Sequence, residues 1–134
     1  YPRIRSYMDE TLEYARKNGY VETLYKRRRH MANINSSNKN LAQAEERAAI
    51  NMPIQGTAAD IMKIAMIRMH ERMQLMGLKS QMLLQVHDEL VFEVVEKSVD
   101  DVQPEIVAIM AAAADLSAPL RVDAGVGKDW DEAH

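Results

Sequence analysis

The longest regular pattern in the sequence runs from about Leu41 to Met76, where apolar residues recur at helical spacing until Gly77 ends the run. Pro53 and Gly56 fall inside this pattern. A proline removes one backbone hydrogen bond from a helix and kinks its axis, so we expect an interruption there. The chain is therefore predicted to fold around one long, kinked helix, against which its shorter elements pack.

The segment before this helix predicts three shorter elements. A helical stripe covers residues 3–17 and stops at Asn18-Gly19, a typical C-terminal signal. A short β-prone stretch, YVETLY, follows, and residues 33–40 are turn formers that predict a polar loop.

The segment after the long helix predicts a strand pair, a helix and a strand. Residues 81–86 and 90–95 are expected to form a hairpin, with a final strand at residues 120–126. Between them, Ser98 and Asp101 have the spacing of a capping box, which predicts a helix to about residue 115. The order of all these elements predicts the α+β class.

Composition excludes several kinds of protein. The chain has 134 residues and no cysteine, which excludes disulfides and thiolate metal sites and fits a reducing, intracellular setting. No apolar run approaches the roughly 18 residues of a membrane span, and the start does not resemble a signal peptide. Because the sequence opens without Met and in mid-pattern, we interpret it as a fragment or a processed chain.

Charge is unevenly distributed along the chain. Residues 1–47 carry ten Lys and Arg against six Asp and Glu, whereas residues 48–134 carry seven against fourteen. One interpretation is a surface that meets phosphates on one side and cations on the other. The alternative is ordinary surface charge that happens to be unevenly spread.

The stretch QVHDELVFEV places His87, Asp88 and Glu89 within an apolar, β-prone run. A tight turn is one explanation, because Asp is a common turn residue. A Mg²⁺ site that works on phosphates is the other, since such sites use hard oxygen ligands and often only one or two protein carboxylates. In that case Asp88 is the predicted ligand, and His87, a poor Mg²⁺ ligand, is expected to form hydrogen bonds instead.

Two further groups of residues are candidates for nucleic-acid contact. The run KRRRH contains Arg27, Arg28 and Arg29, which fit phosphate contact, a localisation signal or an ordinary solvated surface.

The second group lies on the long helix. Arg47, Asn51 and Gln55 recur every four residues, so one helix face presents three hydrogen-bonding side chains. This face suits the acceptors of a duplex minor groove, or is simply the wet side of the helix. The apolar residues around it are expected to face the core (Ala48, Ala49, Ile50, Met52 and Ile54).

Two motif-like strings near the end are interpreted as chance matches. GVGKD at residues 125–129 lacks the Ser or Thr and the glycine spacing of a P-loop. DEAH at residues 131–134 spells a helicase motif, but the chain has no P-loop to accompany it.

Taken in order, NMPIQGTAADIMK, QVHDELVFEV and VGKDWDEAH resemble the C-terminal part of the A family of DNA polymerases. The resemblance implies an α+β fold comprising the end of the fingers with the DNA-contacting helix (residues 1–56) and the second half of the palm (residues 57–134). It further implies two Mg²⁺ ions as cofactors, primer–template DNA and deoxynucleoside triphosphates as partners, and a bacterial cytoplasmic, nucleoid-associated location.

The resemblance also implies roles for individual residues. Asp88 matches one of the two palm aspartates that bind the catalytic Mg²⁺ ions, with Glu89 in a supporting role and His87 near the primer end. Arg47, Asn51 and Gln55 match the helix that contacts the minor groove of the primer–template duplex. The sequence departs from the family pattern at Lys26, where a Gly is usual, and at Leu41 and Ala42, where relatives often carry arginine.

The family's first palm motif, DYSQIELR, and its nucleotide-gripping fingers helix do not occur in this sequence. Two-metal phosphoryl transfer needs both palm aspartates. The chain is therefore expected to need a missing N-terminal part as its partner, and to be inactive alone. Alternatives are a nucleic-acid-binding module without chemistry and a metal-dependent hydrolase, although the hydrolase lacks clustered ligands.

Overall fold

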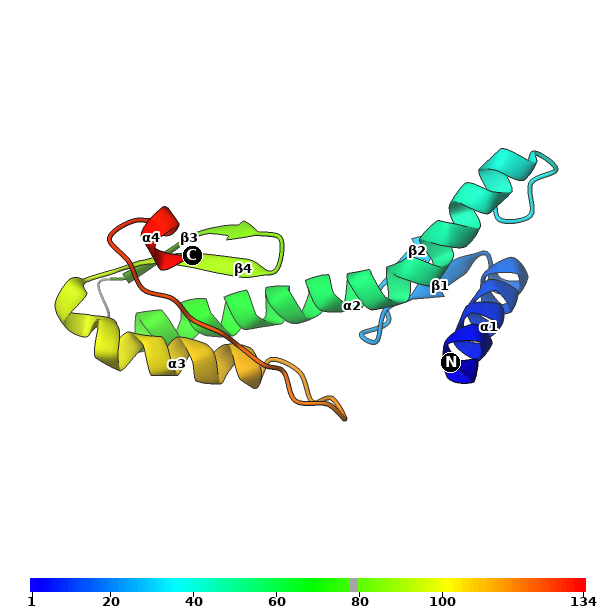
Figure 1. Cartoon of the computed structure of the whole chain (residues 1–134). Coiled ribbons are helices and arrows are strands. Elements are labelled where there is room, and N and C mark those ends of the chain that lie inside the picture. Colours follow the sequence, from blue (N-terminus) through cyan, green and yellow to red (C-terminus); the bar gives the residue numbers. More distant parts are fainter. Residues whose placement is uncertain (78–79) are drawn as a thin grey trace. The chain divides into compact units, whose positions relative to one another are not determined.

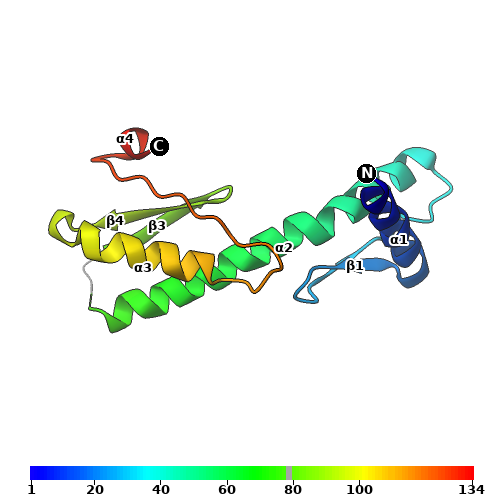
Figure 2. The ribbon, with the colours of Figure 1, turned by 60° about the horizontal axis from the view of Figure 1, so that its bottom comes forward.

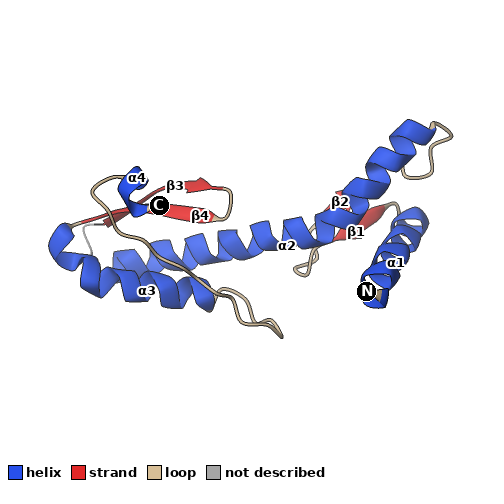
Figure 3. Cartoon of the chain, viewed as in Figure 1, coloured by secondary structure: helices blue, strands red, loops and turns tan. Residues whose placement is uncertain are grey.

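The computed structural model describes residues 1–77 and 80–134 (Figure 1). The chain divides into two compact units, Tyr1–Asp60 and Ile61–His134. The longest helix, α2 (Lys39–Leu75), contributes residues to both units. Helices and two-stranded antiparallel sheets make up the fold, which is the expected α+β class (Figure 3). Within the described ranges, no helix is long and apolar enough to cross a membrane.

The first unit begins with α1 (Pro2–Asn18), which ends where predicted. Gly19 adopts the left-handed conformation with φ 76°, and its N–H donates to the Ala15 carbonyl. The phenol of Tyr7 donates to the Ile50 carbonyl at 3.0 Å, which ties α1 to α2. The core of this unit combines α1, the first strand, the following loop and α2 (Ala15, Val21, Met31, Ile34, Ala49 and Met52).

A small hairpin follows α1. Strand β1 (Tyr20–Glu22) pairs antiparallel with β2 (Arg28–His30), with Val21 opposite Arg29. The sequence predicted β1 but not β2, because the arginine run has no apolar alternation. Backbone pairing with β1, rather than burial of side chains, makes β2 a strand: all three of its residues are exposed.

The loop of this hairpin contains a strained residue. The N–H of Lys26 donates to the Thr23 carbonyl, and the N–H of Thr23 donates to the Arg27 carbonyl. These bonds define a three-residue loop in which Lys26 has φ 66°. The third position of such loops adopts the left-handed conformation and favours Gly, so the Gly that the family resemblance implies at this position would remove the strain.

Helix α2 is continuous through Pro53 and Gly56, so neither residue divides the predicted long helix. Gly56 instead allows the hairpin to approach the helix: a Cβ at this position would lie 2.8 Å from the Thr23 methyl carbon. Two hydrogen bonds hold the hairpin against the helix. The Leu24 N–H donates to the Thr57 hydroxyl at 2.9 Å, and the Arg27 guanidinium donates to the Gly56 carbonyl at 3.0 Å.

The second unit contains the predicted hairpin. Strand β3 (Ser80–Val86) pairs antiparallel with β4 (Glu89–Val94), and Val86 lies opposite Glu89. His87 and Asp88 form the turn, whereas Glu89 already belongs to β4.

After the hairpin come a 3₁₀ turn, η1 (Glu96–Ser98), and α3 (Val99–Ala111). Ser98 is the N-cap residue of α3, but its side chain makes no capping hydrogen bond, so the predicted capping box is wrong. In both views α3 lies alongside the end of α2 (Figure 2). The guanidinium of Arg68 donates to the Ala112 carbonyl at 2.8 Å, and Arg72 pairs with Glu105 at 3.0 Å. Buried apolar residues accompany these contacts (Ala65, Met69, Met73, Val102 and Ala113).

The predicted strand at residues 120–126 is wrong. These residues form an irregular segment before the short helix α4 (Trp130–Ala133). In the part of the chain that the structure describes, this segment pairs with no strand, although β3 and β4 each have an unpaired edge.

Candidate functional site

The β3–β4 turn holds a residue in an uncommon backbone conformation. His87 has φ 52°, whereas Asp88 does not have a positive φ. A two-residue hairpin connection with positive φ at its first position normally uses Gly there. The side-chain amide of Gln85 donates to the His87 carbonyl at 3.0 Å and supports this conformation. Non-glycine residues held in this way cost about 1–3 kcal/mol and are concentrated at functional sites.

The turn separates its two carboxylates. Asp88 is exposed at the tip of the hairpin and has no ion pair among the described residues. Glu89 is partly buried, and its Oε1 lies 3.3 Å from Nδ1 of His134. Asp88 is therefore available to an external cation, whereas Glu89 has an internal contact.

A metal ion at this turn would need further ligands. Among the described residues, no group of three or more His, Asp or Glu side chains is placed to hold one. The exposed carboxylate of Asp88 suits a hard cation such as Mg²⁺, which commonly takes one or two protein carboxylates together with water and phosphate oxygens. The residues present thus fit a shared Mg²⁺ site and do not form a complete one.

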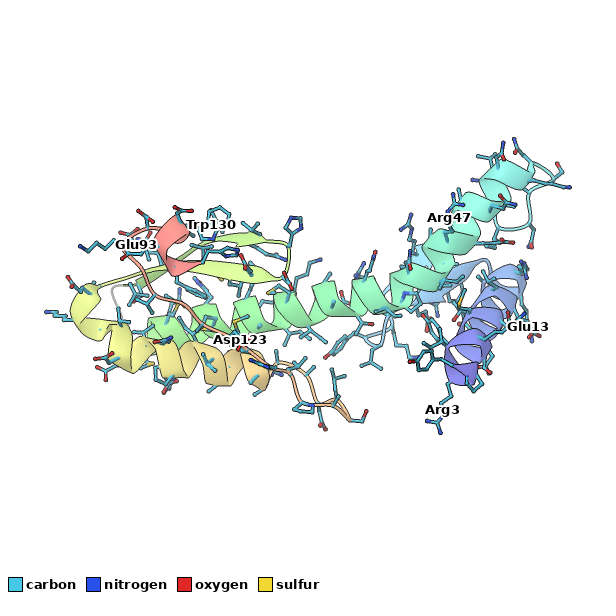
Figure 4. The ribbon with its side chains drawn as sticks, viewed as in Figure 1. Arg3, Glu13, Arg47, Glu93, Asp123 and Trp130 are labelled. Atoms are coloured by element: carbon cyan, nitrogen blue, oxygen red, sulfur yellow. The ribbon has the colours of Figure 1, made fainter. Side chains whose placement is uncertain are left out.

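The three polar residues of α2 lie as predicted on one exposed face. Arg47, Asn51 and Gln55 are all exposed, and none of their side chains has a hydrogen bond or ion pair with another described residue. Figure 4 labels Arg47 on α2. Ile54 was expected to face the core but is 63% exposed, next to this face. The face therefore combines free donors with one exposed apolar side chain.

The arginine run does not act as one cationic group. Arg27 pairs with the Asp60 carboxylate at 2.7 Å, within the first unit. Arg28 pairs with Glu22 at 2.8 Å and lies 4.3 Å from the centre of the Tyr20 ring. Arg29 is exposed and has no ion pair within residues 1–77 and 80–134. Of the three predicted phosphate contacts, only Arg29 has a side chain without a structural partner.

The Arg28 pair also affects the neighbouring carboxylate. The hydrogen bond from Arg28 lowers the pKa of Glu22 below its ordinary value, although desolvation opposes this effect. The pairing thus favours the ionised form of Glu22, which holds Arg28 on the surface of the hairpin.

The predicted residues thus form two groups. His87, Asp88 and Glu89 belong to the unit Ile61–His134, while Arg47, Asn51 and Gln55 belong to the unit Tyr1–Asp60. The sequence did not indicate His134 as a partner of Glu89. The available signal was the spacing of Asp129 and Glu132, which is that of a capping box and predicts an ordered end to the chain.

Comparison with known proteins identifies the family. DNA polymerase family A matches residues 1–132 of the sequence. The chain belongs to this family. Its membership confirms the resemblance inferred from the three sequence motifs.

Two relatives show how much of a family A polymerase the chain represents. DNA polymerase I of Pseudomonas aeruginosa is 50% identical over 134 residues, which are 100% of this chain and 15% of that protein. The thermostable DNA polymerase I of Thermus filiformis is 46% identical over 133 residues, 99% of this chain and 16% of the relative. This family A chain therefore spans about 15% of the length of the P. aeruginosa protein.

A solved structure has the same fold. The POL domain of Pol1 from M. smegmatis, in complex with DNA primer-template and dNTP, matches with a TM-score of 0.93 and 45% identity. The match covers 96% of this chain and 23% of the M. smegmatis chain. The α+β fold of this family A chain is thus that of part of a polymerase domain.

Proposed function

We propose that the chain is the part of a template-directed DNA polymerase that supplies one metal-binding aspartate and a minor-groove contact face. In this proposal, residues 1–56 form the end of the fingers with the DNA-contacting helix, and residues 57–134 form part of the palm. The main support is the free carboxylate of Asp88 on a strained turn, in a chain that belongs to DNA polymerase family A.

The turn residues have distinct roles in the proposed reaction. Asp88 would hold Mg²⁺, and the two bound ions would stabilise the charge on the primer oxygen and the nucleotide phosphates during transfer. Glu89 supports the turn without replacing Asp88 as a ligand, since it already contacts His134. His87 is exposed beside Asp88 and is proposed to donate a hydrogen bond near the primer end.

The α2 face is proposed to lie on the duplex. In the minor groove, the acceptors of A·T and G·C pairs lie in nearly equivalent places, so Arg47, Asn51 and Gln55 can test pair geometry without reading sequence. Arg29 is proposed to contact backbone phosphate, whereas Arg27 and Arg28 serve mainly to fix the β1–β2 hairpin through their ion pairs.

The complete enzyme would need substrates and a second palm aspartate that this chain does not contain. Deoxynucleoside triphosphates and primer–template DNA are its substrates, as the complex of the M. smegmatis relative suggests. The second palm aspartate would come from the N-terminal part of the polymerase. The isolated 134 residues are therefore proposed to bind duplex DNA through α2 but not to extend a primer.

The test uses Asp88→Ala in a full-length polymerase that carries this segment. Incorporation of a single nucleotide should be abolished while the Kd for primer–template remains largely unchanged, because the variant loses metal-held charge in the transition state. Asp100→Ala, an exposed aspartate on α3, is the matched control and should retain full activity. Near-normal incorporation by Asp88→Ala would refute the proposal, and equal damage from Glu89→Ala would show that the two roles are wrongly divided.

A further inference from the structure

Residues 125–134, which contain the GVGKD and DEAH strings, fold back on themselves with close backbone contacts. A Cβ on Gly127 would lie 2.6 Å from the backbone nitrogen of Ala133, closer than real side chains come. A Cβ on Gly125 would overlap the carbonyl oxygen of Ala133. The two glycines therefore allow the loop to lie directly on the backbone of α4.

A reciprocal cap fixes the start of α4. The carboxylate of Asp129 accepts a hydrogen bond from the Glu132 N–H at 2.9 Å. The Glu132 carboxylate in turn accepts one from the Lys128 N–H at 2.7 Å. Each carboxylate thus satisfies a backbone N–H group near the start of the helix; the arrangement differs from a capping box only in that Glu132 accepts from Lys128, one residue before the N-cap. Together with the glycine contacts, this cap fixes where α4 begins and thereby the position of the residues that follow.

Helix α4 ends at Ala133, and its C-cap residue, His134, contacts the first residue of β4. Nδ1 of His134 lies 3.3 Å from Oε1 of Glu89, and its ring meets the Trp130 ring edge-on at 6.4 Å. Glu89 directly follows Asp88 and is the first residue of β4. A segment distant in sequence from the turn therefore contacts the carboxylate next to the proposed metal ligand.

We propose that His134 is a positioning residue for nucleotide transfer, acting by holding the Glu89 carboxylate in one orientation. This inference rests on the proposed function. Without the contact, the Glu89 side chain is free to rotate toward Asp88, where a second negative charge would repel the Asp88 carboxylate or compete with it for the cation. Gly125, Gly127 and the reciprocal cap serve to place His134 correctly.

The test compares variants of a full-length polymerase that carries this segment. His134→Ala should lower kcat about two- to five-fold, the range expected for loss of an exposed polar contact, without changing the KM for nucleotide or the Kd for primer–template. His134→Asn, whose amide nitrogen can take the place of Nδ1, should restore most of kcat. His70→Ala, which removes an exposed histidine from α2, is the matched control and should leave kcat unchanged.

A double-mutant cycle tests whether His134 acts through Glu89. Adding His134→Ala to Glu89→Gln should cause no further loss, because the contact is already weakened. Three outcomes would each overturn the inference. The losses in the double variant could be additive, His134→Asn could be as slow as His134→Ala, or His134→Ala could leave kcat unchanged. If Asp88→Ala also retained activity, the proposed function itself would fail; if only the His134 variants had no effect, this inference alone would fail.

Discussion

At the scale of single residues, two positions have backbone conformations that favour Gly but carry larger side chains. Lys26 has φ 66° in the β1–β2 loop, and His87 has φ 52° in the β3–β4 turn. The proposed function gives a reason to keep a histidine at position 87, beside Asp88. No comparable reason applies to Lys26, whose only ion pair among the described residues is an exposed one of 3.5 Å with Glu22.

Lys26→Gly is therefore expected to stabilise the first unit by up to about 1 kcal/mol. The strain at a left-handed non-glycine residue exceeds the entropy that Gly adds to the unfolded chain and the small value of an exposed ion pair. Thermal unfolding monitored by circular dichroism measures the effect. Lys63→Gly, at an exposed position within α2, is the control and should lower stability by about 1 kcal/mol. A lower melting temperature for both variants would contradict this explanation.

At the scale of elements, the face of α2 is expected to monitor base-pair geometry. Arg47→Ala, Asn51→Ala or Gln55→Ala in the complete polymerase should slow extension, and most strongly extension from mismatched primer ends. Steady-state kinetics on matched and mismatched primers give the ratio of the two extension rates. Gln74→Ala removes an exposed amide from the same helix and should leave that ratio unchanged. Unchanged ratios for all three variants would mean that the face is only a solvated surface.

The contact between α2 and α3 should make stability depend on pH. The hydrogen bond from Arg72 lowers the pKa of Glu105 below its ordinary value. A lowered folded-state pKa adds stability above the pKa of the unfolded chain, and this stability is lost as pH falls through the folded value. The melting temperature should therefore decrease as pH falls below about 4.3, the ordinary Glu value, and less steeply in Glu105→Gln. An identical pH profile in wild type and Glu105→Gln would disprove the Arg72 linkage.

In the first unit, Glu22→Gln should reduce the pH dependence of the melting temperature in the same way, because Arg28 lowers the pKa of Glu22.

At the scale of the whole molecule, the elements with strong local patterns could be predicted from the sequence. The predictions were wrong for elements whose formation depends on strand pairing or tertiary packing. The long helix and the β3–β4 hairpin have clear periodicity, and both were found close to the expected bounds. Strand β2 was missed because its three exposed, polar residues have no apolar alternation. The strand expected at residues 120–126 has such alternation but does not pair.

In the candidate site too, local spacing could be interpreted from the sequence, but contacts between distant residues could not. The spacing of Arg47, Asn51 and Gln55 was sufficient to predict their common exposed face. The pairing of Arg27 with Asp60, and of Glu89 with His134, joins residues far apart in the sequence, so no local pattern indicates it. Exposure of Ile54 was likewise not predictable from helical periodicity alone.

The isolated chain is expected to self-associate. Strands β3 and β4 pair only with each other among the described residues, so each has an outer edge with backbone groups that another strand can join. Exposed leucines on β3 (Leu83 and Leu84) add apolar surface. Analytical ultracentrifugation should detect oligomers of the 134 residues, and adding the N-terminal part of the polymerase should dissociate them before activity appears. A monomeric chain that unfolds cooperatively and extends primers unaided would contradict this expectation.

The close approach of Gly56 to Thr23 has a consequence for sequence variation. Thr23 is buried and β-branched, and its hydroxyl accepts hydrogen bonds from the Tyr25 and Arg27 N–H groups, so its methyl group cannot easily turn away from a new Cβ. In a saturation library selected for polymerase activity, position 56 should therefore retain only glycine, even though alanine is the better helix former. Gly77 has φ 60°, and no atom of the described residues outside its chain neighbours lies within 4 Å of an added Cβ, so this position should accept asparagine in the same library.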